Sequence, residues 1–334
     1  MFVQGVIPDN YICYDYLSFT SKIHSELSIL DLLGLSDLSF ETIKGFYGYR
    51  DRLYFDGISI HFNGRDDMGV CVEMSGKGCR NFEKYSKVEY ETIFDTILDH
   101  YSADSEKREM NITRLDVAYD DFNKVLDLAL LSSETMSHNF VSRFRDWQVI
   151  TGNKGAAVNH GSKSSSVYIR IYDKRLEQHV EDILPHWVRC EIQMRKESSL
   201  GFIKLPKSST INQKYFAVLN NYLRYVQPSE TLHQIDLWET ADYWQNFIEY
   251  GDKESIFCKP ADTYSFNNLY GYVNNQLSGA INTYMDCVGV EQFLKDMNTA
   301  RKGKKLNSKY QDLLYQADKN GDELLKYLKE HNLL

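Results

Sequence analysis

Hydrophobic and polar residues alternate with period two along three central segments, which predicts three β-strands. These segments are 111–121 (NITRLDVAYDD), 165–174 (SSVYIRIYDK) and 186–195 (HWVRCEIQMR). Shorter runs between residues 45 and 76, separated by Gly, Asn and Asp, predict an antiparallel meander. Residues 11–20 are rich in aromatic residues and also resemble a strand. We therefore expect an antiparallel-rich sheet.

Apolar residues recur at helical spacing in the other segments. Residues 23–36 and 88–102 predict short amphipathic helices, and 212–226 also look helical. A further helix is expected after the first central strand, as far as about residue 146. After about residue 263 the pattern predicts only helices. The expected fold is α+β: an antiparallel-rich central sheet with helices on one face and the active site on the other, followed by a helical C-terminal region.

Each central strand has one apolar and one polar face. The polar faces hold two carboxylates, four cations and two tyrosines: Asp116 and Glu191; Arg114, Arg170, Lys174 and Arg189; Tyr168 and Tyr172. If the strands are neighbours in one sheet, these faces form one surface.

Such a surface has the groups that phosphodiester transesterification needs. A tyrosine oxygen can attack phosphorus, and a divalent metal on carboxylate oxygens can polarise the phosphate. Arginine and lysine can stabilise the developing charge and lower the pKa of a phenol. The same pattern is also typical of cross-strand charge pairs on a solvated sheet face. Tyrosine is a good strand former, and the chain has 24.

Other motifs are less informative. The segment SGKGCRNFE (75–83) surrounds Lys77 with glycines and precedes Arg80, which is compatible with a phosphate-binding turn or with a simple hairpin turn. His61 is a single histidine in a predicted hairpin, and we interpret it as structural. The sequence has no His-hydrophobic-His pair and no P-loop motif.

Composition limits the class of protein. The 334 residues carry a net charge of −9 and are 43% hydrophobic, which excludes a DNA-coating protein and a disordered chain. The six cysteines are scattered without a C-x-x-C pair, so we expect reduced thiols and a cytoplasmic protein. No signal peptide or membrane-spanning segment is expected.

The charge is distributed unevenly. Residues 150–215 have eleven Lys/Arg against six Asp/Glu, and residues 294–309 have six against one. Residues 229–262 have only two against eight. This shift predicts a boundary near residue 260, with one domain at 1–260 and a helical region at 261–334.

Four segments, in this order and spacing, resemble the replication initiation factors of the Rep-trans type: SGKGCRNFE, TRLDVAYDD, GSKSSSVYIRIYDKRLEQ and VRCEIQMR. The resemblance covers roughly residues 11–225. It implies a rolling-circle replication initiator or relaxase of a plasmid, conjugative element or phage. Such a protein nicks one strand at an origin with a metal-dependent tyrosine, keeps the 5′ phosphate, leaves a free 3′ hydroxyl and later religates. Residues 1–260 would then be the nicking domain.

The resemblance also implies roles for individual residues. The family motif R-I-Y-[DE]-K matches Arg170 to Lys174 and makes Tyr172 the expected nucleophile. Tyr168 is the second choice, because it shares the strand face. Expected ligands of Mg²⁺ or Mn²⁺ are Asp116 and Glu191.

The expected DNA contacts are the basic residues of these motifs and of the C-terminal joint: Arg114, Arg189, Lys163, Lys77, Arg80, Lys302, Lys304 and Lys305. The expected partners are origin DNA, both duplex and single-stranded, and a host helicase. A homodimer is compatible with the family. Two alternatives stay open: a metal-dependent nuclease without a covalent intermediate, and a non-catalytic origin-binding protein.

Overall fold

The structure is a computed structural model that describes residues 7–152, 155–253, 269, 273 and 277–301. The chain divides into two compact units, Phe2–Lys259 and Pro260–Leu334. In the second unit, helices α10 (Ser278–Val288) and α11 (Val290–Arg301) pack on one another through the rings of Tyr284 and Phe293. The first unit holds the sheet and the predicted site.

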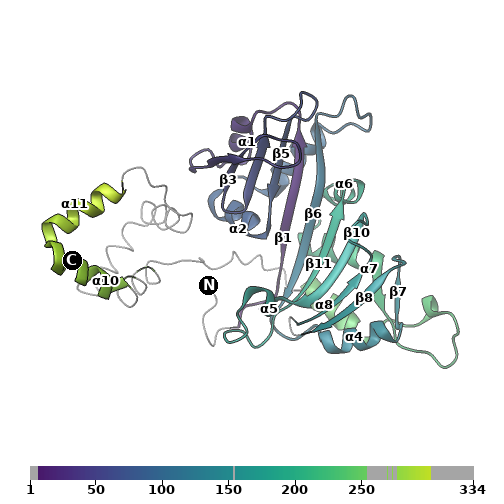
Figure 1. Cartoon of the computed structure of the whole chain (residues 1–334). Coiled ribbons are helices and arrows are strands. Elements are labelled where there is room, and N and C mark those ends of the chain that lie inside the picture. Colours follow the sequence, from purple (N-terminus) through teal and green to yellow (C-terminus); the bar gives the residue numbers. More distant parts are fainter. Residues whose placement is uncertain (1–6, 153–154, 254–268, 270–272, 274–276, 302–334) are drawn as a thin grey trace. The chain divides into compact units, whose positions relative to one another are not determined.

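Ten strands of the described chain form one sheet in the order β2-β3-β4-β5-β1-β6-β11-β10-β9-β8, and all neighbours are antiparallel (Figure 1). The bounds are β1 (Tyr11–Ser21), β2 (Glu41–Lys44), β3 (Asp51–Phe55), β4 (Ile58–Phe62), β5 (Val70–Met74), β6 (Met110–Asp121), β8 (Trp147–Gly152), β9 (Gly155–His160), β10 (Val167–Asp173) and β11 (Val188–Arg195). A separate two-stranded ribbon pairs β7 (Phe140–Ser142) with β12 (Leu223–Tyr225).

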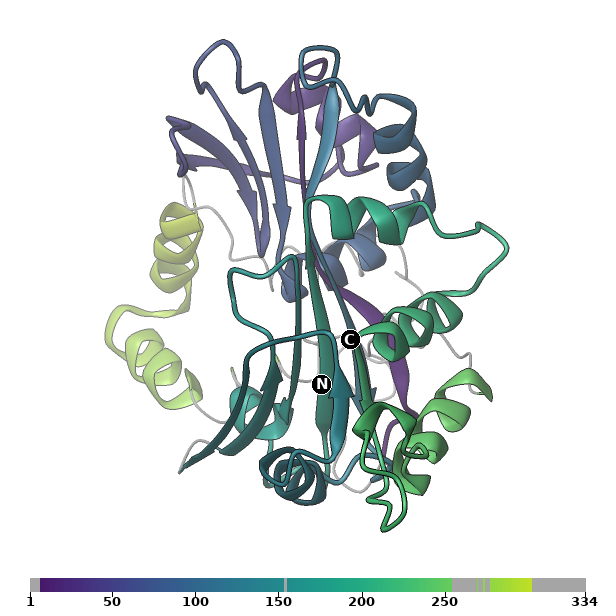
Figure 2. The ribbon, with the colours of Figure 1, turned by 90° about the vertical axis from the view of Figure 1, so that its right-hand side faces the viewer.

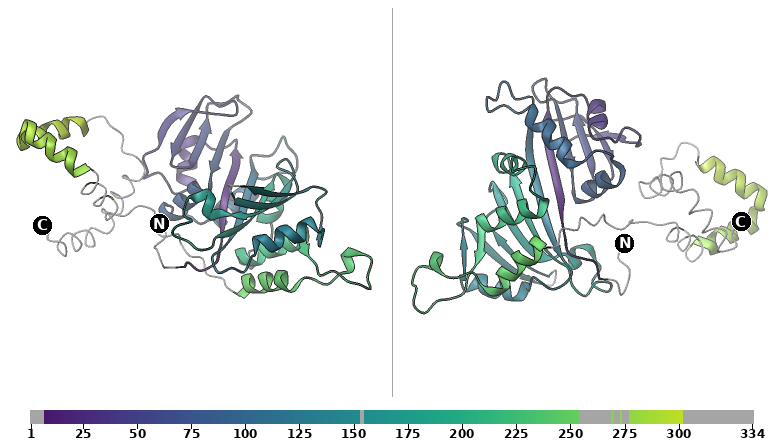
Figure 3. Two further views of the ribbon diagram at one scale, coloured as in Figure 1. Left: turned by 60° about the horizontal axis from the view of Figure 1, so that its bottom comes forward. Right: turned by 180° about the vertical axis from the view of Figure 1, so that it is seen from behind.

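Helices cover one face of this sheet. They are α1 (Glu26–Leu32), α2 (Gly76–Tyr85), α3 (Tyr90–Asp99), α4 (Leu128–Met136), α6 (Glu197–Ile203), α7 (Ile211–Tyr222) and α8 (Asp242–Lys253). The short helix α5 (Lys174–Gln178) follows β10 directly on the side of Tyr172, and the 3₁₀ turn η1 (Ile235–Leu237) contacts β7. The ribbon of α6 and α7 lies against β6 and β11 in Figure 2, and the view from behind in Figure 3 has helices in front of the strands.

Aromatic rings join this face to its helices. Tyr14 of β1 contacts Tyr90 and Phe94 of α3, while Tyr119 of β6 contacts Phe216 of α7 and Phe247 of α8. The alternate residues of the same strands are therefore free to carry the polar groups on the opposite face. The predicted α+β architecture is confirmed.

Two predicted local structures are wrong. The segment 75–83 is not a turn between strands but the beginning of α2, where the Ser75 side chain accepts a hydrogen bond from the Gly78 amide and caps the helix. The helix expected as far as residue 146 ends at Met136, because His138 has a left-handed backbone (φ 58°) and the chain continues into β7, β8 and β9.

Strand β1 contains a β-bulge that simple alternation does not show. Tyr14 pairs with Val117 and Tyr16 with Asp116, so Asp15 is the extra residue on β1. Apolar residues before the bulge occupy even positions and those after it occupy odd ones, with Tyr14 and Leu17 both buried. The bulge brings both Asp15 and Tyr16 to the polar side.

Within the described residues, no helix is long and apolar enough to cross a membrane.

Candidate active site

The three predicted polar faces form one surface because β6, β11 and β10 are consecutive in the sheet. Glu191 lies opposite Arg170 on β10, and Tyr172 lies opposite Arg189. On the other side of β11, Asp116 lies opposite Gln193. Residues directly opposite one another share a sheet face. The backbone register thus gathers the predicted tyrosine, carboxylates and arginines.

Tyr172 is almost fully buried, and its hydroxyl contacts both a carboxylate and a cation. Its hydroxyl donates a hydrogen bond to Glu191 Oε2 at 3.1 Å, and the Lys174 ammonium donates to the same hydroxyl at 3.4 Å. The Arg170 guanidinium lies over the ring, 4.6 Å from its centre. Burial and then the charge of Glu191 hold the pKa of Tyr172 well above its usual range, against the opposing charge of Arg189. The phenol is therefore neutral near pH 7, and its proton has one carboxylate acceptor in contact.

Tyr168 has a different environment. Its side chain is 5% exposed, and its hydroxyl makes no hydrogen bond to the described residues. Burial is the main cause that raises its pKa. Between the two predicted tyrosines, only Tyr172 contacts a carboxylate and a cation.

Asp116 is paired with an arginine yet retains a raised pKa. Arg114 Nε donates to Asp116 Oδ1 at 2.9 Å, and Arg114 Nη2 donates to Oδ2 at 2.5 Å. Burial raises the pKa of the Asp116 carboxyl to about 7; Arg114 opposes the shift, while the charges of Glu191 and Asp15 add to it. An additional cation beside Asp116 would therefore favour its ionised form.

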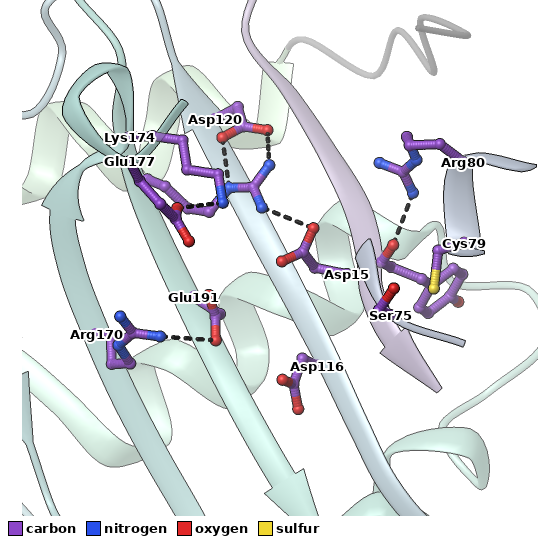
Figure 4. A network of polar contacts seen from close by, with 12 residues as sticks. Asp15, Ser75, Cys79, Arg80, Asp116, Asp120, Arg170, Lys174, Glu177 and Glu191 are labelled. Carbon is purple, nitrogen blue, oxygen red and sulfur yellow. Dashed lines mark hydrogen bonds and ion pairs between the residues drawn. The ribbon is translucent and has the colours of Figure 1, made fainter. Parts of the chain in front are cut away.

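Arg189 is buried between two carboxylates. It contacts Asp120 through Nε at 2.7 Å and Nη2 at 2.6 Å, and it contacts Asp15 through Nη1 at 2.6 Å. The two carboxylates, Asp120 and Asp15, are labelled in Figure 4. Burial alone would raise the pKa of Asp15, but Arg189, Lys174 and Arg80 together lower it. Arg189 therefore joins β11, β6 and β1 and has its charge balanced within the protein, rather than being presented to solvent.

The surroundings of Asp15 were not predicted. Arg80 of α2 donates to the backbone carbonyl of Tyr14 at 2.6 Å, next to the bulge. A Cβ at position 76 would lie 2.7 Å from Asp15 Oδ1, so the glycine leaves room for this carboxylate. The SGKGCR motif thus supports the site through packing. One feature of the sequence, a charged residue within an aromatic strand, could have drawn attention to Asp15.

The remaining predicted residues lie in several places. Lys77 is exposed on α2 and forms an ion pair with Asp56 at 2.5 Å. Lys163 is exposed in the turn between β9 and β10. Lys174 is buried and forms an ion pair with Glu177, a partner that the sequence did not reveal (Figure 4). The last three predicted DNA contacts, Lys302, Lys304 and Lys305, lie outside the described residues.

The carboxylates fit a hard cation only in part. Among the residues that the structure describes, no group of three or more His, Cys, Asp and Glu side chains is arranged to hold a metal ion. Magnesium, however, is commonly bound by one or two carboxylates together with water and substrate phosphate. Asp116 and Glu191 are diagonal neighbours on adjacent strands, and the charge of Glu191 raises the pKa of Asp116. These two residues are the candidate ligands.

Comparison with known proteins defines the class. The model of the family "Replication initiation factor" matches residues 110–299, and that of the "Rolling Circle replication initiation protein N-terminal domain" matches residues 11–98. The Bacillus subtilis (strain 168) protein named "Putative DNA relaxase NicK" is 29% identical over 264 residues, which are 74% of this chain and 73% of that protein.

A solved structure gives the same result. The rolling circle replication initiator protein from Geobacillus stearothermophilus matches with a TM-score of 0.65 and 27% identity, over 73% of this chain and 97% of that chain. Fold and sequence together define a protein of the rolling-circle initiator and relaxase class. The chain belongs to the replication initiation factor family, as the ordered motifs predicted.

Proposed function

We propose that this protein nicks one strand of origin DNA by tyrosine transesterification and later rejoins it. The observation that carries the proposal is the contact of the Tyr172 hydroxyl with both Glu191 and Lys174, on a sheet face that also holds Asp116. In this reaction the Tyr172 oxygen forms a bond to phosphorus and the bond from phosphorus to the 3′ oxygen breaks. The products are a 5′-phosphotyrosine and a free 3′ hydroxyl.

The tyrosine proton passes to Glu191 in this mechanism. The raised pKa of Tyr172 keeps the phenol protonated before attack, so a base must accept the proton as the new bond forms. Glu191 Oε2 is 3.1 Å from the hydroxyl and already accepts its hydrogen bond. The departing 3′ oxygen takes a proton from solvent. In the closing reaction, Glu191 returns its proton to the tyrosine oxygen.

Arg170 is the cation best placed to meet the scissile phosphate. Its side chain is 37% exposed, and it is 3.7 Å from Glu191, which is a loose ion pair. It also covers the Tyr172 ring. An entering phosphate can attract this guanidinium and uncover the phenol without removing a tightly bound partner. Arg114 and Arg189 are held more closely by their carboxylates.

Mg²⁺ or Mn²⁺ is part of the proposal, with Asp116 and Glu191 as ligands. A bound divalent ion would supply charge stabilisation at the phosphate oxygens. The two carboxyl groups contribute oxygen donors, and the ionised form of Asp116 becomes more favourable beside a cation.

A covalent-adduct assay tests the nucleophile. The full chain is mixed with a supercoiled plasmid that carries its origin and with Mg²⁺ or Mn²⁺, and protein-linked DNA is measured on a denaturing gel. We expect an adduct from the wild type and from Tyr168→Phe, and none from Tyr172→Phe. An adduct from Tyr172→Phe would refute the assignment of the nucleophile.

A nuclease without a covalent intermediate is the second candidate, and the high pKa of Tyr172 is the observation in its favour. It predicts that Tyr172→Phe nicks the plasmid at the wild-type rate and that Glu191→Gln does not. Nicking of the plasmid, measured beside adduct formation in the same samples, separates the two reactions.

A further inference from the structure

The hairpin between β2 and β3 exposes two aromatic rings at its tip. Phe46 is 52% exposed and Tyr47 is 69% exposed, although large aromatic side chains usually bury most of their area. Their centroids are 6.3 Å apart and their planes are inclined at 65°. Neither ring belongs to the site around Tyr172.

The loop that presents these rings is well ordered by its own contacts. The Gly45 amide donates to the Arg50 carbonyl at 2.8 Å, and the Tyr49 amide donates to the Phe46 carbonyl at 2.9 Å. A Cβ at Gly45 would lie 2.7 Å from backbone oxygens, which explains the glycine. The backbone turn that presents the two rings is thus held by contacts within the protein.

Arginine accompanies the exposed rings. The Arg52 guanidinium lies 4.6 Å from the centre of the Phe46 ring and 5.0 Å from that of Tyr54, and its Nη1 donates to Ser59. Within the described part of the chain, no carboxylate forms an ion pair with Arg52 or with the exposed Arg50. A cation stacked on aromatic rings and without an acidic partner is suited to a phosphate group.

The register places this hairpin on the same sheet face as Tyr172. Asp116 shares its face with Tyr16 on β1, and the pairing of Ser18 with Glu73 continues that face to β5. The pairs Glu73–Ser59 and Ser59–Tyr54 then carry it to β3. Tyr54 and Arg52 therefore lie on the polar face, away from the helices.

Side-chain contacts also join the two places. The Arg114 guanidinium that holds Asp116 lies 4.1 Å from the centre of the Tyr16 ring, and the Tyr16 hydroxyl donates to Glu73 at 2.8 Å. Glu73 in turn contacts His61 at 3.1 Å, and the His61 ring is 5.7 Å from that of Tyr47. The sheet order puts β3 six strands from β10, which is about 29 Å across the sheet at the usual spacing. The register places Tyr172 level with Tyr11 of β1 and Arg52 level with Thr20, a further offset of about 30 Å along the strands. The two places are therefore roughly 40 Å apart.

We infer that Phe46, Tyr47 and Arg52 form a stacking site for unpaired bases of a DNA strand that crosses the polar face toward Tyr172. The inference rests on the proposed function, and it adds a binding site remote from the chemistry. Aromatic rings stack on any unpaired base, and arginine holds the neighbouring phosphate. A separation of this length is within the reach of a single strand of several nucleotides. Paired bases hide their faces, so duplex DNA is not the expected ligand.

The test measures binding without chemistry. Full-length Tyr172→Phe protein is titrated into a fluorescein-labelled thymidine homopolymer of about 20 nucleotides, longer than common single-strand sites, and anisotropy is recorded. Adding Phe46→Ala and Tyr47→Ala should weaken binding at least about tenfold. The conservative Tyr47→Phe should keep wild-type affinity, because the ring remains. Leu27→Ala, which removes a 64% exposed side chain from α1, should have no effect.

Charge and stacking can be separated in the same assay. Arg52→Ala should make the slope of log affinity against log salt concentration shallower by about one or less, which corresponds to at most one lost phosphate contact. The aromatic variants should leave this slope unchanged. A blunt duplex of the same length should bind the wild type and the aromatic variants equally. Circular dichroism and thermal unfolding confirm that each variant is folded.

Several outcomes would overturn the inference. The first is an unchanged affinity of the Phe46→Ala/Tyr47→Ala variant, and the second is an equal loss of affinity for single-stranded and duplex DNA. The third is that the parent protein does not bind the homopolymer. The fourth is that the Phe46→Ala/Tyr47→Ala variant sediments differently but binds DNA with unchanged affinity, which would make the rings a contact between copies of the chain. The adduct assay with Tyr172 tests the proposed function independently. Loss of single-strand affinity in the aromatic variants, together with a wild type that forms no adduct on origin DNA, would support the stacking site and refute the nicking mechanism.

Discussion

Replacing Asp116 by asparagine should stabilise this protein at alkaline pH, although it removes an ion pair. Burial raises the pKa of Asp116 from 3.8 to about 7, even with Arg114 in contact. Between these two values the folded protein holds a proton that the unfolded chain has released. Raising the pH through this range therefore costs folding free energy. Asparagine resembles the protonated carboxyl in shape and never ionises.

The size of the effect follows from the two pKa values. Relative to strongly acidic solution, the raised pKa of Asp116 lowers the free energy of unfolding by about 4 kcal/mol at pH 8 and by about 1.5 kcal/mol at pH 5. From pH 5 to pH 8, the free energy of unfolding of Asp116→Asn should thus rise by about 2.5 kcal/mol relative to that of the wild type. Differences in packing are the same at both pH values and cancel, whereas the change in the Arg114 contact on ionisation is already contained in the pKa.

Urea titration at the two pH values measures this shift, with the exposed Asp66→Asn as the matched control. The control should show equal effects at both pH values. Added Mg²⁺ or Mn²⁺ should stabilise the wild type at pH 8 and have little effect on Asp116→Asn, because a bound cation favours the ionised carboxyl. A difference between wild type and variant that is independent of pH would refute the raised pKa of Asp116.

Further substitutions test the framework and the chemistry of the site. Arg189→Met should lower the free energy of unfolding by about 3–5 kcal/mol in urea titrations, because buried Asp120 and half-buried Asp15 lose the arginine between them; a loss below about 1 kcal/mol would contradict this. Gly78→Ala should destabilise the protein by about 1–3 kcal/mol in thermal unfolding, because the added Cβ would lie 2.2 Å from the Gly57 carbonyl oxygen. The control Gly201→Ala in α6 adds a Cβ in open space and should stabilise the protein by up to about 1 kcal/mol. Lys174→Met should slow adduct formation roughly a hundredfold in single-turnover reactions with unchanged DNA affinity.

The central strands were predictable because their chemistry is local. Period-two alternation assigns Asp116, Glu191 and Tyr172 to polar strand faces without knowledge of the partners. These three side chains come together only if the three predicted strands are neighbours in the sheet, and the order β6-β11-β10 fulfils that condition. The ordered motifs then identified the family, which the comparisons confirmed. The roles of the individual residues stay predictions until the adduct assay is done.

Features that depend on distant segments were not predictable in the same way. The β1 bulge is stabilised by Arg80 from α2 and by Arg189 from β11, residues 65 or more positions away, so alternation within β1 could not indicate where Asp15 lies. The β8–β9 hairpin was missed because its apolar pattern is weak and β8 is half exposed. Helix α2 was hidden by its two glycines, which are poor helix formers but are required by close neighbours.

Burial is the main cause of the raised pKa of Asp116, and the charges around Tyr172 add to it. The buried or half-buried groups of the site and their direct partners are five carboxylates and four cations: Asp15, Asp116, Asp120, Glu177 and Glu191; Arg114, Arg170, Lys174 and Arg189. If all are ionised, one negative charge is left over, and a buried site resists such an excess. Protonation at Asp116 removes it in the free protein. One divalent cation together with one phosphodiester would also remove it, so substrate and metal together would favour the ionised site that the proposed reaction uses.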